Sequence, residues 1–190
     1  MEAAELLPSI SGARLRDADE HALIRRAQQG SAEAFEELFR RSWRPAYRAA
    51  YLVVQDSAAA EDIAQEAIIA AIRHLDRFDR TRPFGPWLHR ITVNRAIDWA
   101  RASRLRPSPS PEPDGEQAAD GSPSELSDEV IAAISKLPED HRAVVALRYV
   151  LDHTPGEIAE MLEVPRGTVN SRLRRALDAL RPAIEEARSA

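Results

Sequence analysis

Cysteine is absent from this chain of 190 residues. Disulfides, thiolate zinc sites and cysteine nucleophiles are therefore excluded. Glycine is scarce, with 7 residues, and aromatic residues make up 5% of the chain. Alanine, leucine, arginine and glutamate recur throughout and β-branched runs are short, so local preferences favour helices over sheet. We expect an all-α protein.

Long apolar runs are also missing, since no stretch approaches the roughly 20 residues that span a bilayer. The acidic N-terminus lacks the basic-then-apolar order of a signal peptide. We therefore expect a cytoplasmic protein without membrane insertion. The 5 histidines do not have metal-ligand spacing, and no serine or carboxylate pair forms a nucleophile or acid–base motif. The expectation is no metal, no cofactor and no enzyme activity.

Charge is distributed unevenly along the chain. The net charge of -5 taken alone argues against an anionic partner such as DNA. Between Arg82 and Arg106, however, the basic residues are opposed only by Asp98, and those between Arg166 and Arg175 are unopposed. These two basic patches are candidate nucleic-acid contacts, and most of the negative balance lies between them.

The segment that separates the patches, residues 107–124, reads PSPSPEPDGEQAADGSPS. Its proline, glycine, serine and acidic content cannot supply a packed core. We predict a flexible acidic linker here. Two small helical domains should flank it, at 19–106 and 125–187, each with a limited core, and residues 1–18 should form an N-terminal tail.

In the first predicted domain, Gly30 and Ser31 form a helix stop and an N-cap before a long amphipathic pattern. Asp56 or Ser57 can cap the next helix. One side of that helix carries an acidic strip, Glu61, Asp62, Gln65 and Glu66. The strip is either a docking surface or an ordinary solvated helix face.

Aromatic residues are mixed with arginines between Phe78 and Arg106. Single-stranded nucleic acid is bound by stacking on aromatic rings while a basic groove follows the phosphates, and both ingredients are present. We expect Trp99 to belong to the core. Phe84, between Pro83 and Gly85, should instead lie in a loop where its ring is available for stacking.

The second predicted domain ends in a helix-turn-helix pattern. Thr154, Pro155 and Glu157 form a capping box with proline at the first helical position, and a short break follows at 163–165. Apolar residues of the two helices can pack across this break, namely Ile158, Leu162, Val169, Leu173 and Leu177. The outer face of the second helix carries short polar and arginine side chains suited to base edges: Arg166, Thr168, Asn170, Ser171 and Arg174. The alternative is a plain helical hairpin with solvated arginines.

Three segments together resemble the sigma-70 family in its smallest, extracytoplasmic-function (ECF) group. They are AEDIAQEAIIAAIRHLDRF, RPFGPWLHRITVNRAIDWAR and LPEDHRAVVALRYVLDHTPGEIAEMLEVPRGTVNSRLRRALDAL. The resemblance implies that 19–106 is similar to region 2 and 125–187 to region 4 of a bacterial RNA polymerase sigma factor. Such a protein binds core RNA polymerase, recognises promoter DNA and initiates transcription. An anti-sigma factor is a common further partner in this group.

The resemblance also implies roles for individual residues. The acidic strip would dock on core polymerase. The duplex minus-thirty-five element would be read by the outer-face residues named above together with Arg172 and Arg175. The loop and helix from Phe78 to Arg101 would capture and open the single-stranded minus-ten element, with Asn94 and Asp98 at the NxxxD positions of the family. These minus-ten candidates are Arg80, Arg82, Phe84, Trp87, Arg90, Asn94, Arg95 and Asp98.

The sequence departs from the family at two positions. Glu163 stands where the turn usually has glycine, and Pro155 replaces a common aromatic residue. A second function also stays open, that of a stand-alone helix-turn-helix regulator of transcription that binds duplex DNA. The first predicted domain discriminates between the two, because such a regulator needs neither the aromatic and arginine mixture nor the acidic strip.

Overall fold

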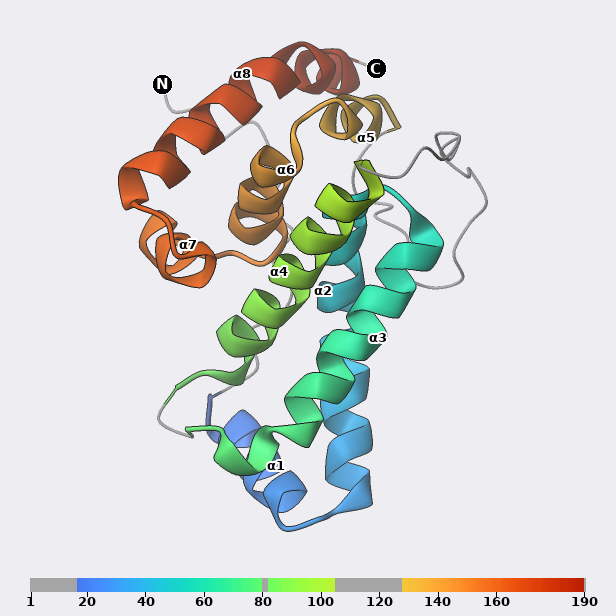
Figure 1. The fold of residues 1–190 in the computed structure, drawn as a ribbon, viewed down its shortest axis with the longest axis vertical. Coiled ribbons are helices and arrows are strands. Elements are labelled where there is room, and N and C mark those ends of the chain that lie inside the picture. The colour runs from blue at the N-terminus through green and yellow to red at the C-terminus, as the bar shows by residue number, and fades with distance from the viewer. Residues whose placement is uncertain (1–16, 80–81, 105–127, 190) are drawn as a thin grey trace.

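The computed structural model describes residues 17–79, 82–104 and 128–189 (Figure 1). Every regular element in these ranges is a helix, so the expected all-α class is confirmed. The predicted linker 107–124 and most of the predicted tail 1–18 lie outside the described residues. Within the described part of the chain, no helix is long and apolar enough to cross a membrane.

The first helical unit comprises α1 to α4. Its elements are α1 (Asp17–Gln28), α2 (Ala32–Val54), α3 (Ser57–Arg73), the short 3-10 helix η2 (Leu75–Arg77) and α4 (Phe84–Arg104). Helices α2, α3 and α4 pack against one another, and α1 packs against α2 and η2 (Figure 1). The apolar faces expected from the sequence form its core.

Local capping explains where α2 and α3 begin. The Ser31 hydroxyl accepts a 3.3 Å hydrogen bond from the Ala34 amide, and Gly30 takes a φ of +88° that a side chain would strain. Asp56, rather than Ser57, caps α3 by accepting from the Ala59 amide at 2.8 Å. The predicted stop at Gly30 and the two predicted caps are confirmed.

The second helical unit comprises α5 to α8. Its elements are α5 (Asp128–Ser135), α6 (Glu139–Val145), the π-helical turn η3 (Ala146–Val150), α7 (Pro155–Leu162) and α8 (Arg166–Ser189). The long helix α8 packs against α5, α6 and α7. Helices α7 and α8 form the predicted helix-turn-helix.

The two units pack against each other, an arrangement that the sequence did not predict. Helix α6 contacts α2 and α4, η3 contacts α2, and α7 contacts α4. In Figure 1, α4 lies between α3 on one side and α6 and α7 on the other. The buried apolar side chains of both units form one continuous core, so apolar burial holds the units together.

Candidate nucleic-acid interface

Three aromatic rings cluster where α4 begins. Ring centroids lie 5.7 Å apart between Phe78 and Phe84, 4.9 Å between Phe78 and Trp87, and 5.7 Å between Phe84 and Trp87. Phe84 is only 2% exposed and is the first residue of α4. The expectation that Phe84 projects from a loop is therefore wrong. Trp87 remains half-buried, and it is the ring of this cluster that reaches the surface.

Glu20 of α1 provides the reason for the position of Phe84. Its carboxylate accepts a 2.7 Å hydrogen bond from the Phe84 amide, and the Glu20 side chain is buried. The first amides of a helix lack partners within the helix, so this contact caps α4. The capping residue lies 64 positions earlier in the chain, and a local pattern around Pro83 and Gly85 could not reveal it. Trp99 packs against the core, as expected.

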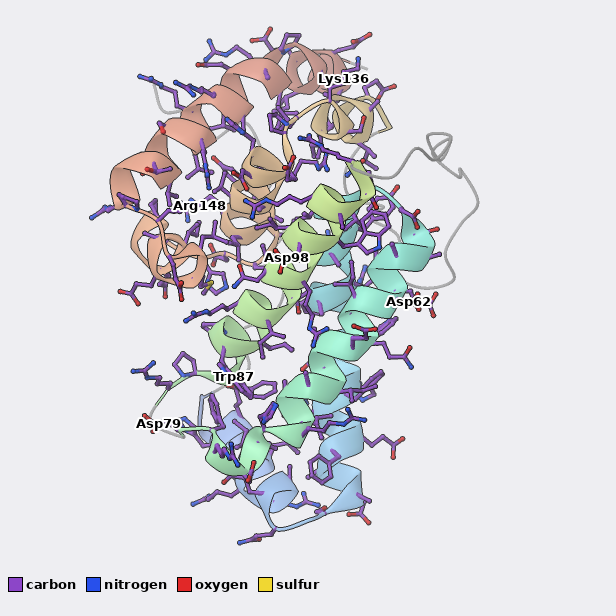
Figure 2. The ribbon with its side chains drawn as sticks, in the orientation of Figure 1. Asp62, Asp79, Trp87, Asp98, Lys136 and Arg148 are labelled. Atoms are coloured by element: carbon purple, nitrogen blue, oxygen red, sulfur yellow. The ribbon has the colours of Figure 1, made fainter. Side chains whose placement is uncertain are left out.

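The remaining minus-ten candidates lie on or just before α4. Arg90, Asn94 and Asp98 follow one another at four-residue steps, so they share one face of the helix; Arg90 and Asp98 are exposed and Asn94 is half-buried. Figure 2 shows Trp87 towards the start of α4 and Asp98 farther along the same helix. Arg82 is exposed and lies 3.9 Å from Asp79. Arg80 lies outside the described residues.

Each of the four arginines of α4 pairs with a carboxylate of the chain. Arg95 pairs with Glu66 of α3 at 2.8 Å. The other three pair with the second unit: Arg90 with Glu163, Arg101 with Asp140 at 3.0 Å, and Arg104 with Glu139 at 2.7 Å. Glu66 and Glu163 are exposed, and exposed pairs of this kind are typically worth less than about 1 kcal/mol each. Arg90 and Arg95 can therefore exchange these partners for phosphates at little cost, whereas Glu139 is buried.

The acidic strip is exposed along the outer side of α3. All four of its residues are exposed: Glu61, Asp62, Gln65 and Glu66. Figure 2 shows Asp62 on the side of α3 that faces away from α4. Ile69 lies two turns after Asp62 and is 36% exposed, which makes it the one large exposed apolar residue of the described chain. Sequence reasoning missed Ile69, although its spacing from Asp62 places it on the strip's face.

The helix-turn-helix begins with the predicted capping box. The Thr154 hydroxyl accepts from the Glu157 amide at 3.3 Å, and the Glu157 carboxylate accepts from the Thr154 amide at 2.7 Å. Glu163 takes a left-handed conformation with φ of 54°. Glu163 therefore adopts the left-handed conformation that glycine adopts without strain, at a cost of about 1 kcal/mol.

The two faces of α8 separate as predicted. Val169 is fully buried, as is Ile158 of the facing α7, and Leu173 is nearly so. On the other face, Arg166, Asn170 and Arg174 are exposed at four-residue steps. We call these last three residues the outer stripe. They present two guanidinium groups and one amide to the surface.

The other minus-thirty-five candidates differ in position. Arg175 is exposed, whereas Thr168 and Ser171 are half-buried, and the Ser171 hydroxyl donates to the Thr168 carbonyl at 2.9 Å. Arg172 points away from the outer stripe. Its guanidinium lies 2.8 Å from Asp140 of α6, and its side chain is 22% exposed. Arg172 is thus engaged within the second unit, by the same carboxylate that pairs with Arg101 of α4.

A histidine pair joins α4 to the second unit, and sequence reasoning missed it. His89 Nδ1 and His153 Nε2 are 2.8 Å apart, so one ring must donate and the other accept. Burial lowers the pKa of His89 to about 3, with a smaller contribution from His153, and burial also lowers the pKa of His153. Both rings are therefore neutral at pH 7. Among the described residues, no group of three or more histidines and carboxylates could hold a metal ion.

Two family models match the chain along its length. Residues 38–106 match sigma-70 region 2, which includes most of α2 and all of α3 and α4. Residues 127–180 match sigma-70 region 4, which includes the helix-turn-helix. The exposed face of α4 and the outer stripe of α8 therefore fall in different regions of one family.

Similar proteins are RNA polymerase sigma factors. The chain is 33% identical to the ECF sigma factor SigW of Bacillus subtilis, over 86% of this chain and 95% of that protein. It is 35% identical to the ECF sigma-E factor of Escherichia coli K12, over 83% and 90% of the two chains. The solved structure of CnrH in complex with the cytosolic domain of CnrY has a TM-score of 0.65 at 26% identity, over 88% of this chain and 97% of CnrH. The chain belongs to the sigma-70 family, as an ECF sigma factor, a non-catalytic subunit that directs RNA polymerase to promoters.

Proposed function

We propose that this sigma factor divides promoter recognition between α4 and α8. Helix α4 binds the single-stranded minus-ten element, and α8 binds the duplex minus-thirty-five element. The observation that carries the proposal is the exposed polar face of α4, where Arg90, Asn94 and Asp98 lie in line beyond the half-exposed Trp87. A protein that binds only duplex DNA has no need for such a face beside an aromatic ring.

At the minus-ten element, Trp87 is the ring that can stack on an unpaired base, since base stacking on an aromatic side chain contributes about 1 to 3 kcal/mol. Asn94 and Asp98 supply amide and carboxylate groups for base edges. The DNA phosphates are contacted by Arg82, Arg90 and Arg95, and also by Arg80. Phe84 positions Trp87 through their ring contact and is not itself a stacking platform.

At the minus-thirty-five element, the outer stripe of α8 enters the major groove. Arg166, Asn170 and Arg174 can contact base edges, because arginine pairs with guanine and asparagine with adenine. Thr168 and Ser171 border the stripe, and Arg175 is placed for phosphate contact. Arg172 joins this set once it leaves Asp140.

Core polymerase binds the acidic strip of α3. Four polar or acidic side chains on one helix face suit a basic partner surface, and Ile69 adds an apolar contact at the end of the strip. We add an anti-sigma factor to the proposed partners on family grounds. A related fold, RpoE of Bartonella quintana, was solved in complex with the anti-sigma factor NepR. The sigma factor works in the cytoplasm, where promoter DNA and polymerase are found.

Run-off transcription tests whether promoter recognition is divided between α4 and α8 as proposed. Purified core polymerase is mixed with the full chain and a library of promoter sequences, and the transcribed promoters are sequenced. We expect transcripts to depend on the chain and the selected promoters to share two separated motifs. A stand-alone regulator would bind duplex DNA yet support no transcription with core polymerase, and that result would contradict the proposal.

A further inference from the structure

Helix α1 contacts both ends of the segment that joins α3 to α4. At the first end, the Gln28 side-chain amide donates a 2.7 Å hydrogen bond to the carbonyl of Leu75, the first residue of η2. At the second end, the Glu20 carboxylate accepts a 2.7 Å hydrogen bond from the amide of Phe84, the first residue of α4. Figure 1 shows α1 beside η2 at one end of the bundle. We call Glu20 and Gln28 the α1 pair.

Both members of the α1 pair lie on one face of their helix. Glu20, Ile24 and Gln28 follow one another at four-residue steps, so their side chains share that face. Ile24 is fully buried, Glu20 is buried and Gln28 is half-buried. The face that makes the two hydrogen bonds is therefore also the face that packs into the core. The bonds join residues 47 and 64 positions apart in the chain.

The two hydrogen bonds meet the backbone of the two phenylalanines that support Trp87. The Leu75 carbonyl that accepts from the α1 pair also accepts from the Phe78 amide at 3.1 Å, and a carbonyl has lone pairs for both. The carboxylate of the α1 pair contacts the Phe84 amide directly. The centroids of the Phe78 and Phe84 rings lie 4.9 and 5.7 Å from that of Trp87. The α1 pair therefore fixes the backbone from which both supporting rings project.

An aromatic surface binds an unpaired base best when the ring is already in place. Ordering a side chain or a loop on binding uses free energy that would otherwise contribute to affinity, and apparent affinity falls with the fraction of protein that is competent to bind. Trp87 lies in the first turn of α4, so the position of its ring depends on where α4 begins. Glu20 caps that beginning from a buried site, where the Glu20 carboxylate is not available to DNA.

We propose that Glu20 and Gln28 are positioning residues for capture of the minus-ten strand. They hold the two supporting phenylalanine rings so that Trp87 is placed to stack on an unpaired base before DNA arrives. Neither residue contacts the DNA. Helix α1 precedes residues 38–106, which match sigma-70 region 2, so the proposed minus-ten surface depends on a helix outside that match. This inference rests on the proposed function of α4.

Binding of single-stranded DNA by the full chain in complex with core polymerase tests this role. The probes are a labelled strand that carries the minus-ten sequence selected by run-off transcription and a scrambled strand of the same composition. The α1 variant is Glu20→Leu with Gln28→Leu, because leucine suits a helix but neither accepts nor donates a hydrogen bond.

The α1 variant should lose its preference between the two strands. Its affinity for the minus-ten strand should fall by about tenfold or more, since each hydrogen bond contributes about three- to tenfold. Its affinity for the scrambled strand should change by less than about twofold, because the arginines that contact phosphates are unchanged. A general loss of folding would lower both affinities together, whereas misplacement of Trp87 lowers the ratio between them.

Two further variants separate positioning from stability. Ile24→Val removes one methyl group from the same buried face of α1 and leaves both hydrogen bonds intact, so it should lower the midpoint of urea unfolding and keep the parent's preference. Glu20→Gln retains a side-chain oxygen that can accept from the Phe84 amide, so it should bind the minus-ten strand within about threefold of the parent. A loss of preference in Ile24→Val as large as that in the α1 variant would overturn the positioning role.

A double-mutant cycle shows whether the α1 pair acts through Trp87. The leucine substitutions should add less than about twofold to the loss caused by Trp87→Ala, because the ring that they misplace is then absent. Losses that multiply in full would show that the pair acts elsewhere and would overturn the proposal. If the double leucine variant is unfolded by circular dichroism, Gln28→Leu alone, at a half-buried position, should show a loss of about three- to tenfold and the same dependence on Trp87.

Failure of the proposed function gives a different result from failure of the positioning role. If the parent complex itself does not prefer the minus-ten strand to the scrambled strand, α4 does not bind that strand and the positioning role is wrong with it. If the parent shows the preference and a folded α1 variant shows it equally, only the role of Glu20 and Gln28 is overturned.

Discussion

Glu66 of α3 lies 2.8 Å from Arg95 of α4, so the acidic strip and the proposed minus-ten surface share an ion pair. A partner that binds the strip through Glu66 would compete for this carboxylate and release Arg95. The proposed polymerase docking and the proposed release of Arg95 for DNA would therefore be coupled through one exposed contact, which exchanges easily.

Reversal of charge on the strip should weaken binding to core polymerase. In the variant Asp62→Arg with Glu66→Arg, positive charges would meet a basic partner surface, and we expect a loss of about tenfold or more in affinity at low salt. Competition for core polymerase against the parent measures the loss. The control, Glu36→Arg with Glu186→Arg, makes the same charge change at exposed positions elsewhere. Equal competition by parent and strip variant would show that polymerase binds another surface.

Removal of the Glu20 carboxylate should destabilise the first unit. Glu20→Ala deletes the cap of α4 and leaves the Phe84 amide without its acceptor, and the loss of a cap costs about 0.5 to 2 kcal/mol. Urea unfolding followed by circular dichroism measures the change. Glu36→Ala, at an exposed position of α2, serves as the control, and equal stability of the two variants would argue against the capping role.

The sequence predicted elements whose causes are local. The Ser31 cap, the Thr154 capping box and the buried face of α8 each follow from residues within a few positions of one another. The structure confirms them because short-range hydrogen bonds and helical periodicity decide these features.

The features that the sequence did not predict depend on distant residues. Glu20, 64 positions earlier in the chain, caps α4 at the Phe84 amide and so places the Phe84 ring against Phe78. The direction of Arg172 depends on Asp140, 32 positions away. Tertiary packing thus overturned the loop position and the exposed ring predicted for Phe84, whereas the DNA contact assigned to Arg172 stays a prediction.

Acidification should destabilise the packing of the two helical units through the pair of His89 and His153. Burial gives His89 a pKa of about 3 in the folded chain, against 6.5 for an unperturbed histidine, so the unfolded chain binds the extra proton first as pH falls. The stabilisation is present above pH 6.5 and is lost as pH falls below it, by about 1 kcal/mol at pH 5.5. Glu157 and Asp152 oppose this shift at His153.

Unfolding by urea at pH 7.5 and pH 5.5 checks this pH dependence. The variant His89→Gln removes the titrating ring and should show a smaller loss of stability between the two pH values than the parent. His74→Gln, at an exposed histidine, should behave as the parent does. A parent and a His89→Gln variant with the same pH response would contradict the assignment.

Variants on α8 should separate base reading from phosphate contact. Asn170→Ala or Arg174→Ala should change which minus-thirty-five sequence is preferred, because these residues belong to the outer stripe. The discrimination between bases at the contacted position should fall by about 1 to 3 kcal/mol. Arg175→Ala should weaken binding to all sequences and reduce the salt dependence. Selection from a promoter library in the presence of core polymerase measures both. An unchanged sequence preference in Arg174→Ala would show that a face of α8 other than the outer stripe enters the groove.

The most direct test of the account is promoter opening by Asn94→Ala in complex with core polymerase, compared with Asn170→Ala. Permanganate reactivity of promoter thymines reports the melted bases, and a pre-melted promoter removes the need for opening. We predict that Asn94→Ala binds polymerase and forms the closed complex normally, loses permanganate reactivity, and recovers transcription on the pre-melted promoter. Asn170→Ala should instead lose closed-complex formation and gain little from pre-melting. If Asn94→Ala opens duplex promoters as well as the parent does, α4 does not hold the minus-ten strand through this face and the central claim is wrong.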